Sequence, residues 1–272
     1  MDISNRINSE KTFYDNFYAE GWEKQDRPIG EDIVPPNMGI YWDMVKSHVN
    51  GLKEKTPQPV VLDCGCGHGV LSVLLGQLGV RVIAVDISLN STLITRNLAR
   101  ANNVDAGILP VVAAMENLPF KPGVFDSVLG TRVLHHVDID NTSRELVRVI
   151  KPGTRAFFWE CTEKNPVLRF ARNNIRKILP APKFGTAHEH PLTRREIATL
   201  GASFGSPAVL VKAPFYFFGL INQYISSRYR ESLTELGKKL DTLISAILPG
   251  LNDFSFHQIL VLKKPSDKSN ST

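Results

Sequence analysis

A glycine-rich loop followed by a lone acid is the part of this sequence with the clearest chemistry. The run Asp63-Cys64-Gly65-Cys66-Gly67-His68-Gly69 separates a β-branched stretch from a helical pattern, and Asp86 ends the next apolar stretch. Glycines let a backbone approach a ligand closely, and a helix N-terminus favours negative charge. A carboxylate at the end of a second strand can accept hydrogen bonds from both hydroxyls of a ribose. The two segments together predict a nucleoside site.

The spacing of this loop excludes two common nucleotide sites. A dinucleotide fingerprint would need a third glycine where this chain has Val70. No Lys-Ser/Thr pair follows the loop, so it is not a P-loop. The predicted ligand is therefore a nucleoside that lacks a pyrophosphate.

Two pairs of histidines are the candidates for acid–base chemistry, because a histidine titrates near neutral pH. His135 and His136 follow an expected fourth strand, and His188 and His190 precede a helix start at Thr193. Glu160, at the end of an expected fifth strand, points toward the same region. The alternative for the first pair is packing, and for the second pair an ordinary surface loop.

The elements that position these residues follow from an alternation of strand and helix patterns after Pro59, which is typical of a parallel sheet. In such a sheet the glycine loop and Asp86 lie side by side at the C-terminal strand ends. Apolar residues between two late strands fit one helical face, predicted to belong to a roof over the pocket: Leu233, Leu236, Leu240, Leu243, Ile244, Ile247 and Leu248. Strands are expected at 60–63, 81–86, 108–113, 125–131, 155–160, 208–212 and 256–263, and helices at 70–78, 90–102 and 138–150.

Five motifs in this order resemble the class I S-adenosylmethionine-dependent methyltransferases of the small-molecule "methyltransferase 11" type. They read VLDCGCGHG, VIAVDIS, ENLPF, FDSVLGTRVLHHV and ELVRVIKPG. The resemblance implies an α/β, three-layer Rossmann-like fold with a mostly parallel seven-stranded sheet and an antiparallel last strand. It also implies S-adenosyl-L-methionine as the methyl donor and S-adenosyl-L-homocysteine as the product.

The resemblance also assigns cofactor-binding positions. Asp63 and the glycine loop would hold the amino-acid part of the cofactor, Asp86 the ribose, and Ile87 the adenine. The family usually has an Asp where this chain has Ala114, which leaves adenine recognition to the backbone around Met115 or to another side chain. The full predicted set is Asp63, Gly65, Cys66, Gly67, His68, Gly69, Asp86, Ile87, Ser88, Ala114, Met115, Glu116, Thr131 and Arg132.

The positive charge of the chain is concentrated in one segment. The chain carries a net +5, and residues 164–195 contain eight Lys or Arg against one acid, Glu189, so the other residues sum to −2. Within this segment a helix over 166–179 places Arg169, Arg172 and Arg176 beside an apolar face. A basic amphipathic helix predicts contact with an anionic membrane surface or with a phosphate on a substrate.

The flanks of the core favour an apolar acceptor. An aromatic cluster precedes the core, and the run Phe215-Tyr216-Phe217-Phe218 follows it. We therefore expect a lipid-like, isoprenoid, polyketide or aromatic metabolite as acceptor, with a sugar or lipid-linked glycan, or a non-catalytic cofactor-binding regulatory protein, as alternatives. Trp159-Glu160-Cys161-Thr162 faintly resembles a segment of RNA cytosine methyltransferases, but their Pro-Cys after the fourth strand is absent, so no nucleic-acid partner is expected.

The predicted organisation is an N-terminal cap (1–57), a cofactor-binding core (58–161), a C-terminal part of the same domain with a helical lid (162–264), and a frayed tail (265–272).

Composition excludes several other classes. Three cysteines are too few for a disulfide framework, and Cys64-x-Cys66 lacks a second ligand pair, so no metal site is predicted. No signal peptide is visible, and no apolar run is long enough to span a membrane. The predicted location is the cytoplasm, and the basic helix adds the expectation of peripheral contact with the inner face of a membrane.

Overall fold

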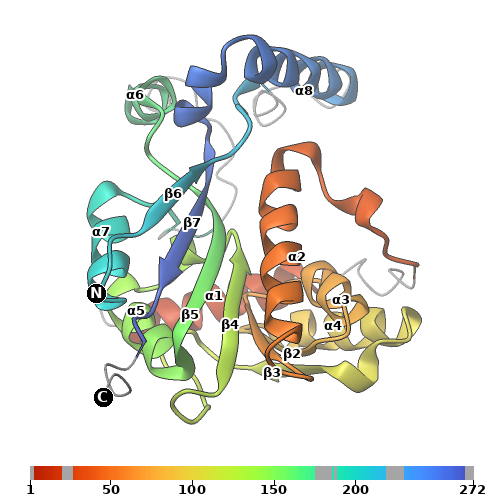
Figure 1. Ribbon diagram of the computed structural model, residues 1–272. Coiled ribbons are helices and arrows are strands. Elements are labelled where there is room, and N and C mark those ends of the chain that lie inside the picture. Colours follow the sequence, from red (N-terminus) through yellow and green to blue (C-terminus); the bar gives the residue numbers. More distant parts are fainter. Residues whose placement is uncertain (1–2, 20–26, 175–185, 187–188, 219–229, 267–272) are drawn as a thin grey trace.

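The computed structural model describes residues 3–19, 27–174, 186, 189–218 and 230–266 (Figure 1). His188, the second half of the predicted basic helix and the end of the predicted tail lie outside these residues. The seven strands and the helices named below lie within them.

One seven-stranded sheet forms the centre of the molecule, with the strand order β3-β2-β1-β4-β5-β7-β6. Strand β7 runs antiparallel to both β5 and β6, whereas the other pairs are parallel. The predicted sheet, including its antiparallel last strand, is confirmed. The strands are β1 (Val60–Cys64), β2 (Arg81–Asp86), β3 (Ile108–Val112), β4 (Phe125–Thr131), β5 (Ile150–Cys161), β6 (Val209–Lys212) and β7 (His257–Lys263).

Helices cover both faces of the sheet and make it a three-layer structure (Figure 1). On one face a buried cluster joins α2 (Gly39–Lys53), α3 (Val70–Gln77) and α4 (Leu89–Ala101) to the strands. On the other face a second cluster packs α5 (Ile139–Val149) and α7 (Arg194–Ser203). The predicted start of α7 is confirmed, because Thr193 and Glu196 form a reciprocal capping box.

Strand β5 is longer than the sequence suggests. It begins at Ile150, directly after α5, and therefore includes Lys151-Pro152-Gly153, which the pattern places before the strand. Gly153 adopts a φ of 79° and donates its N–H to the carbonyl oxygens of Lys264 and Pro265. Pairing of Ile150 with Phe125 of β4, and contact of Gly153 with the residues directly after β7, accompany this extension.

Additional segments surround the C-terminal edge of the sheet. Helix α1 (Ile3–Phe17) and the short turns η1 (Glu31–Ile33) and η2 (Pro36–Met38) come from the N-terminus. Helix α6 (Pro166–Asn174), helix α8 (Arg230–Ile247) and the turn η8 (Pro249–Phe254) lie together at the top of Figure 1. No described helix is both long enough and apolar enough to cross a bilayer.

The sequence predicts an apolar face on α8 but not the direction in which that face points. Leu236, Leu243 and Ile247 are exposed, whereas the polar residues Lys238 and Asp241 face the cavity beneath the helix. The helical period identifies an apolar face, but the contacts of the helix decide which face turns inward. Here Asp241 is buried and accepts hydrogen bonds from the N–H groups of Phe217 and Phe218, which hold its polar face against the protein.

Candidate cofactor and acceptor site

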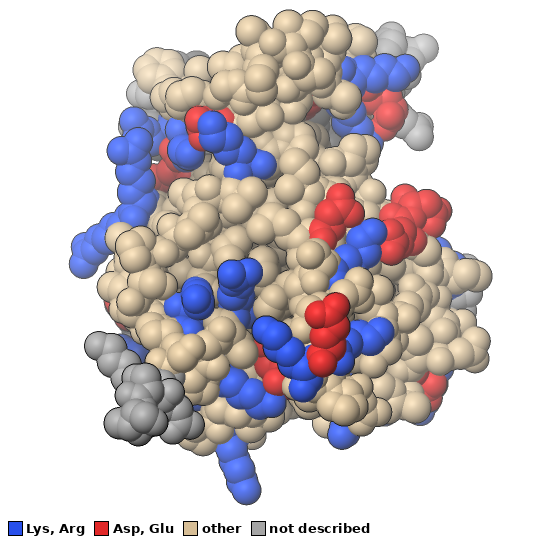
Figure 2. Space-filling model, in the orientation of Figure 1, with Lys and Arg blue, Asp and Glu red and all other residues tan. Residues whose placement is uncertain are grey.

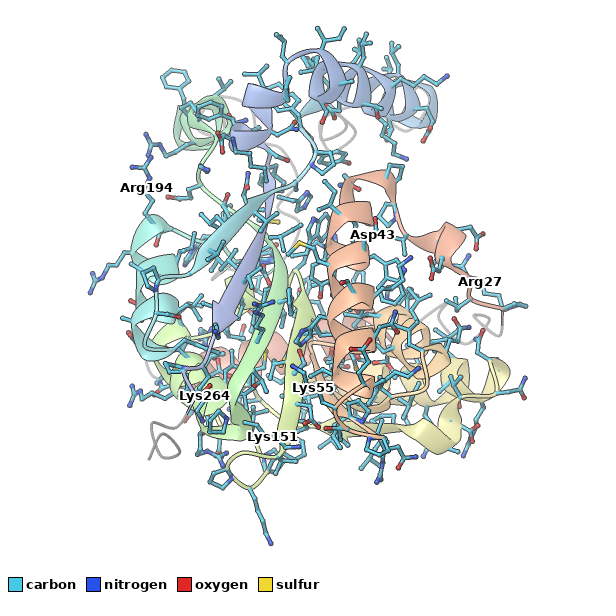
Figure 3. The ribbon with its side chains drawn as sticks, in the orientation of Figure 1. Arg27, Asp43, Lys55, Lys151, Arg194 and Lys264 are labelled. Carbon is cyan, nitrogen blue, oxygen red and sulfur yellow. The ribbon has the colours of Figure 1, made fainter. Side chains whose placement is uncertain are left out.

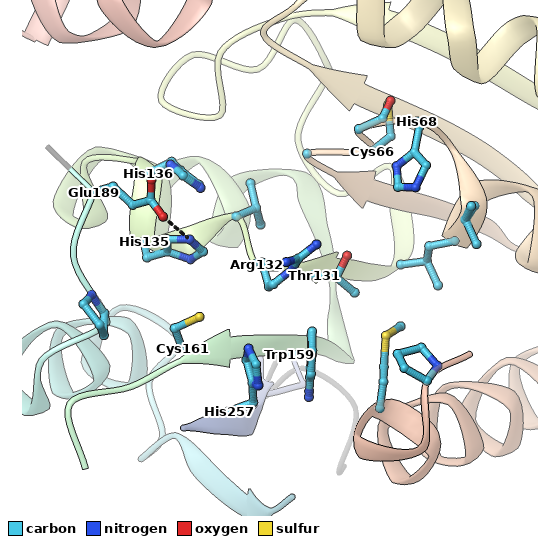
Figure 4. A pocket seen from close by; sticks show the side chains of 18 of the residues that line it. Cys66, His68, Thr131, Arg132, His135, His136, Trp159, Cys161, Glu189 and His257 are labelled. Carbon is cyan, nitrogen blue, oxygen red and sulfur yellow. Dashed lines mark hydrogen bonds and ion pairs between the residues drawn. The ribbon is translucent and has the colours of Figure 1, made fainter. Parts of the chain in front are cut away.

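A cavity of about 1600 Å³ opens at the C-terminal ends of β1, β2 and β4. The connection after β1 leads to β2 on one side of it, and the connection after β4 leads to β5 on the opposite side. Open α/β sheets bind ligands at the C-terminal strand ends between two strands whose connections diverge in this way. Figure 4 shows His135 and His136 on one side of the cavity, Cys66 and His68 on the other, and Thr131 and Arg132 between them.

The glycine loop is shaped by three positive φ angles, 64° at Gly65, 54° at Gly67 and 84° at Gly69. A Cβ at Gly65 would lie 2.4 Å from a methyl carbon of Val133, and one at Gly69 would lie 2.8 Å from the Cα of Thr95. A Cβ at Gly67 would instead fill the cradle beneath the Tyr18 hydroxyl, 3.1 Å away. The loop therefore needs glycine for its packing at two positions, and at the third a Cβ would meet only the Tyr18 hydroxyl.

Asp86 connects the loop to the next helix. Its Oδ2 accepts a hydrogen bond from the Gly67 N–H at 2.9 Å, and its Oδ1 accepts one from the Ser88 N–H at 2.9 Å. Burial raises the pKa of Asp86, while these N–H donors favour its charged form. Ser88 does not line the cavity; its hydroxyl caps α4 by accepting from the Ser91 N–H.

Asp63 lies beneath the loop rather than in the cavity wall. It is buried, accepts a hydrogen bond from the Ser72 hydroxyl at 2.6 Å and does not line the cavity. Burial, partly offset by that bond, raises its pKa to about 7. Asp63 therefore connects the end of β1 to α3 beneath the glycine loop.

The predicted cofactor-binding residues that do line the cavity are Gly65, Cys66, Gly67, His68, Asp86, Ile87, Ala114, Met115, Glu116, Thr131 and Arg132.

Helix α1, which belongs to the predicted N-terminal cap, closes one side of this site through polar contacts that the sequence did not predict. Arg6 pairs with Glu116 and donates to the His136 carbonyl oxygen at 2.6 Å. Asp15 accepts a hydrogen bond from the Ser88 hydroxyl at 2.7 Å. Glu116 also accepts a hydrogen bond from the Asp138 N–H, so its carboxylate connects α1 to the start of α5 in the cavity wall. The aromatic residues of α1 were the available signal in the sequence.

His135 is held between two carboxylates. Its Nδ1 lies 2.8 Å from Glu160 Oε2, and its Nε2 lies 3.6 Å from Glu189 Oε1. The other oxygen of Glu160 accepts from the N–H groups of Val133 and Leu134, which fixes that carboxylate. Burial alone would lower the pKa of His135, but its bonds to Glu160 and Glu189 outweigh burial and raise the pKa to about 9.

His136 and a second buried carboxylate lie beside this pair. The Nε2 of His136 is 3.2 Å from the Tyr14 hydroxyl, and its Nδ1 is 3.6 Å from Glu10 Oε2. Glu10 is almost fully buried, and its other oxygen accepts a hydrogen bond from Thr186. His190 lies at the cavity rim with a half-exposed side chain, its Nε2 3.6 Å from Glu196 Oε1. The structure thus brings His135 and His136 to the cavity wall and places Glu160 behind His135 rather than in the lining, and it adds Glu10, Tyr14 and Glu189.

Comparison with known proteins places the chain in a family. Residues 62–158 match the family model described as "Methyltransferase domain". A ubiquinone biosynthesis O-methyltransferase of Sinorhizobium fredii is 30% identical over 230 residues, which cover 81% of this chain and 90% of that protein. The chain belongs to the S-adenosylmethionine-dependent methyltransferases.

Other methyltransferases are similar to this one over different parts of its length. A sarcosine/dimethylglycine N-methyltransferase of Halorhodospira halochloris is 32% identical over 148 residues, 53% of each protein. The geranyl diphosphate C-methyltransferase of Streptomyces coelicolor A3(2), solved with S-adenosyl-L-homocysteine, aligns with a TM-score of 0.56 and 16% identity, over 95% of this chain and 98% of that one. The structural likeness confirms the predicted fold.

The residues of this methyltransferase fit S-adenosylmethionine. Gly67 lines the cavity without a side chain, and its N–H donates to the Asp86 carboxylate, which lines the same cavity. Ile87 and Met115 line the same cavity and offer apolar surface for a base. When bound, the cofactor supplies an electrophilic methyl group on a sulfonium, and the chain has to hold and orient both partners of the transfer.

Proposed function

We propose that this methyltransferase transfers a methyl group to a small, largely apolar acceptor. The observation that carries the proposal is the aromatic lining of the cavity beyond the glycine loop. Phe13 and Phe17 contribute from α1, and Phe215, Tyr216 and Phe256 from the C-terminal part. Aromatic walls gain free energy by covering apolar surface and hold a flat or extended ligand in place.

The polar end of the acceptor would face the histidine side of the cavity. His135, His136 and Glu189 lie across the cavity from the glycine loop, with Thr131 and Arg132 between (Figure 4). We place the reacting atom between these two sides, where the histidines can orient it by hydrogen bonds for in-line displacement at the methyl carbon. The roles of His135, His136 and His190 in catalysis are part of this proposal.

Methyl transfer to paired acceptors tests the preference for an apolar substrate. We expect kcat/KM for a prenylated phenol to exceed that for the unprenylated phenol by about 100-fold, since each buried methylene contributes about 0.8 kcal/mol. Sarcosine serves as the polar comparison. Transfer of labelled methyl from S-adenosylmethionine provides the rate, and calorimetry with S-adenosylmethionine and S-adenosylhomocysteine first establishes cofactor binding. Equal kcat/KM for the two phenols, or a preference for sarcosine, would contradict the proposed acceptor class.

We further propose that the outer surface of α6, α8 and η8 rests on an anionic membrane, where an apolar acceptor would be available. We call this surface the apolar platform. Phe170 and Ile247 are each 65% exposed and belong to a group of exposed apolar residues, and a large exposed apolar patch marks an interaction site. Arg169 is exposed on the same helix as Phe170. Figure 2 shows a largely uncharged top over these elements, whose side chains are drawn as sticks in Figure 3. The exposed apolar residues of these elements are Val167, Phe170, Leu233, Leu236, Leu240, Leu243, Ile247, Leu248, Leu251 and Phe254.

Co-sedimentation with vesicles tests the apolar platform. The protein is expected to sediment with phosphatidylcholine vesicles that contain phosphatidylglycerol, and less so as salt rises. Phe170→Ser with Ile247→Ser should lower the partition coefficient by about tenfold or more, because both side chains lose apolar burial in the interface. Leu109→Ser with Val112→Ser is the matched control, since these exposed residues lie on β3. Equal losses in the two double variants, or no sedimentation of the wild type, would refute membrane contact through this surface.

A further inference from the structure

Three polar atoms without hydrogen-bond partners belong to one buried cluster in the cavity wall. Among the described residues, Glu10 Oε2, His136 Nδ1 and Glu189 Oε2 are buried and have no hydrogen-bond partner. Glu10 is only 4% exposed but lines the cavity, so a group that occupies the cavity can reach it. A buried carboxylate oxygen or imidazole nitrogen without a partner costs about 1–3 kcal/mol or more. Three such atoms in one cluster indicate that something else binds there.

Both imidazoles are already oriented for a ligand. The Nδ1 of His135 is bound to Glu160, which directs its Nε2 toward Glu189 at 3.6 Å. The Nε2 of His136 contacts the Tyr14 hydroxyl, which leaves Nδ1 facing Glu10. Histidines that bind metals almost always donate their second nitrogen to a carboxylate or another fixed acceptor, and the His135–Glu160 pair has this arrangement.

We propose that His135, His136 and Glu189 bind a divalent first-row transition metal ion. One nitrogen of each imidazole and one oxygen of Glu189 lie within 4.8 Å of one another. Two histidines and one carboxylate are a common ligand set for such ions, with the remaining positions open. Glu10, whose free oxygen lies 3.6 Å from His136, adds a further negative charge beside the site.

The charge of the cluster also favours a cation. Glu10, Glu160 and Glu189 approach the two imidazoles, and Arg6, the nearby arginine of α1, is already paired with Glu116. Metal–ligand distances of about 2.0–2.2 Å would require the donors to move inward. Glu189 can follow such a movement more readily than the histidines, because its side chain is 28% exposed and lies in a loop, whereas that of His135 is 6% exposed.

The site goes beyond the proposed function, because the donor sulfonium does not need a metal. All three ligands line the cavity, so an open coordination position would face an acceptor. A metal ion there could bind an oxygen of the acceptor and lower the pKa of a hydroxyl group. Sequence reasoning missed the site because Glu189 is more than 50 residues from the histidine pair.

Metal binding by the intact protein tests this site without any assay of activity. Titration calorimetry with Zn²⁺ should show one site per chain, and Zn²⁺ should raise the melting temperature. Glu189→Gln and Glu10→Gln keep the size of each side chain and remove its charge. We expect Glu189→Gln to weaken Zn²⁺ binding about 100-fold and Glu10→Gln about tenfold, while His48→Gln, on α2, leaves binding unchanged.

Two further measurements distinguish a metal site from a self-contained ion-pair network and from binding by cysteine. Co²⁺ should give an absorption spectrum without the intense thiolate band, because the buried cysteines are not ligands. The metal-free Glu10→Gln variant should melt at or above the wild-type temperature, since it removes a carboxylate oxygen without a partner. A lower melting temperature of that variant together with an unchanged response to Zn²⁺ would show a self-contained ion-pair network. That result, a thiolate band, or no Zn²⁺ binding by the wild type would overturn the proposal.

Discussion

Replacing Asp86 with alanine should weaken binding of S-adenosylmethionine by at least about 100-fold. A hydrogen bond to a charged group contributes about 1.5–3 kcal/mol, and two ribose hydroxyls would lose such an acceptor. The same change removes the acceptor of the Gly67 N–H and therefore loosens the cradle itself. Calorimetry with S-adenosylmethionine and S-adenosylhomocysteine measures both affinities, and both should fall together because the two ligands share the ribose.

Asp126 provides the matched control for Asp86. It is buried to a similar degree, but it lies near the start of β4, at the opposite end of the parallel strands from the cavity. Its carboxylate accepts from the Val60 N–H at 2.9 Å and pairs with Lys151 at 2.7 Å. Asp126→Ala should lower the melting temperature and leave cofactor affinity within about twofold of the wild type, as expected for a site outside the cavity. Unchanged affinity in Asp86→Ala would disprove the ribose role.

Local patterns were sufficient to predict the core of the fold. The glycine loop, the capping box at Thr193 and the strand ending in Asp86 each depend on residues close together in the sequence. Their chemistry is set by backbone geometry that a few neighbouring residues determine. The parallel arrangement then places the glycine loop and Asp86 at one edge of the sheet, and for that reason the sequence predicts their common place in the cavity wall.

The walls of the cavity could not be predicted in the same way. The contact of Arg6 with Glu116 and that of Glu10 with His136 join residues more than 100 positions apart, and no local period encodes such pairs. The outward direction of the apolar face of α8 also depends on a contact with another segment of the chain. Its period is visible in the sequence, but the buried contact of Asp241 with residues 217 and 218 determines its direction.

The contrast between local patterns and contacts of distant residues also explains why the sequence suggests a different role for the histidines than the structure does. A histidine that follows a strand near the expected methyl group suggests a general base. In the structure His135 lies between Glu160 and Glu189, and His136 between Tyr14 and Glu10. With carboxylates on both sides, His135 has its pKa raised to about 9, so it already carries a proton at neutral pH, and a metal ion that binds there has to displace that proton. The partners of a titratable group, which come from distant segments, therefore decide which chemistry it can perform.

Gly69→Ala should lower the free energy of unfolding by about 2–5 kcal/mol. Alanine in the left-handed region costs roughly 1–2 kcal/mol, and forcing extra volume into a packed contact typically adds about 1–3 kcal/mol. At Gly69 the new Cβ would lie 2.7 Å from the Thr95 hydroxyl and 2.8 Å from the Thr95 Cα. A shift of the Thr95 side chain cannot relieve the contact with its backbone, so the loop or α4 has to move.

Gly123→Ala separates the two contributions to this loss. Gly123 has a similar φ of 63°, but a Cβ there meets no atom within 4 Å. Its loss of unfolding free energy in urea should therefore stay near 1 kcal/mol, the conformational part alone. The Gly69 variant should in addition bind S-adenosylmethionine more weakly, because the contact with Thr95 displaces the loop that forms the cradle. If both variants lost equal stability, contact with Thr95 would not be the reason that position 69 needs glycine.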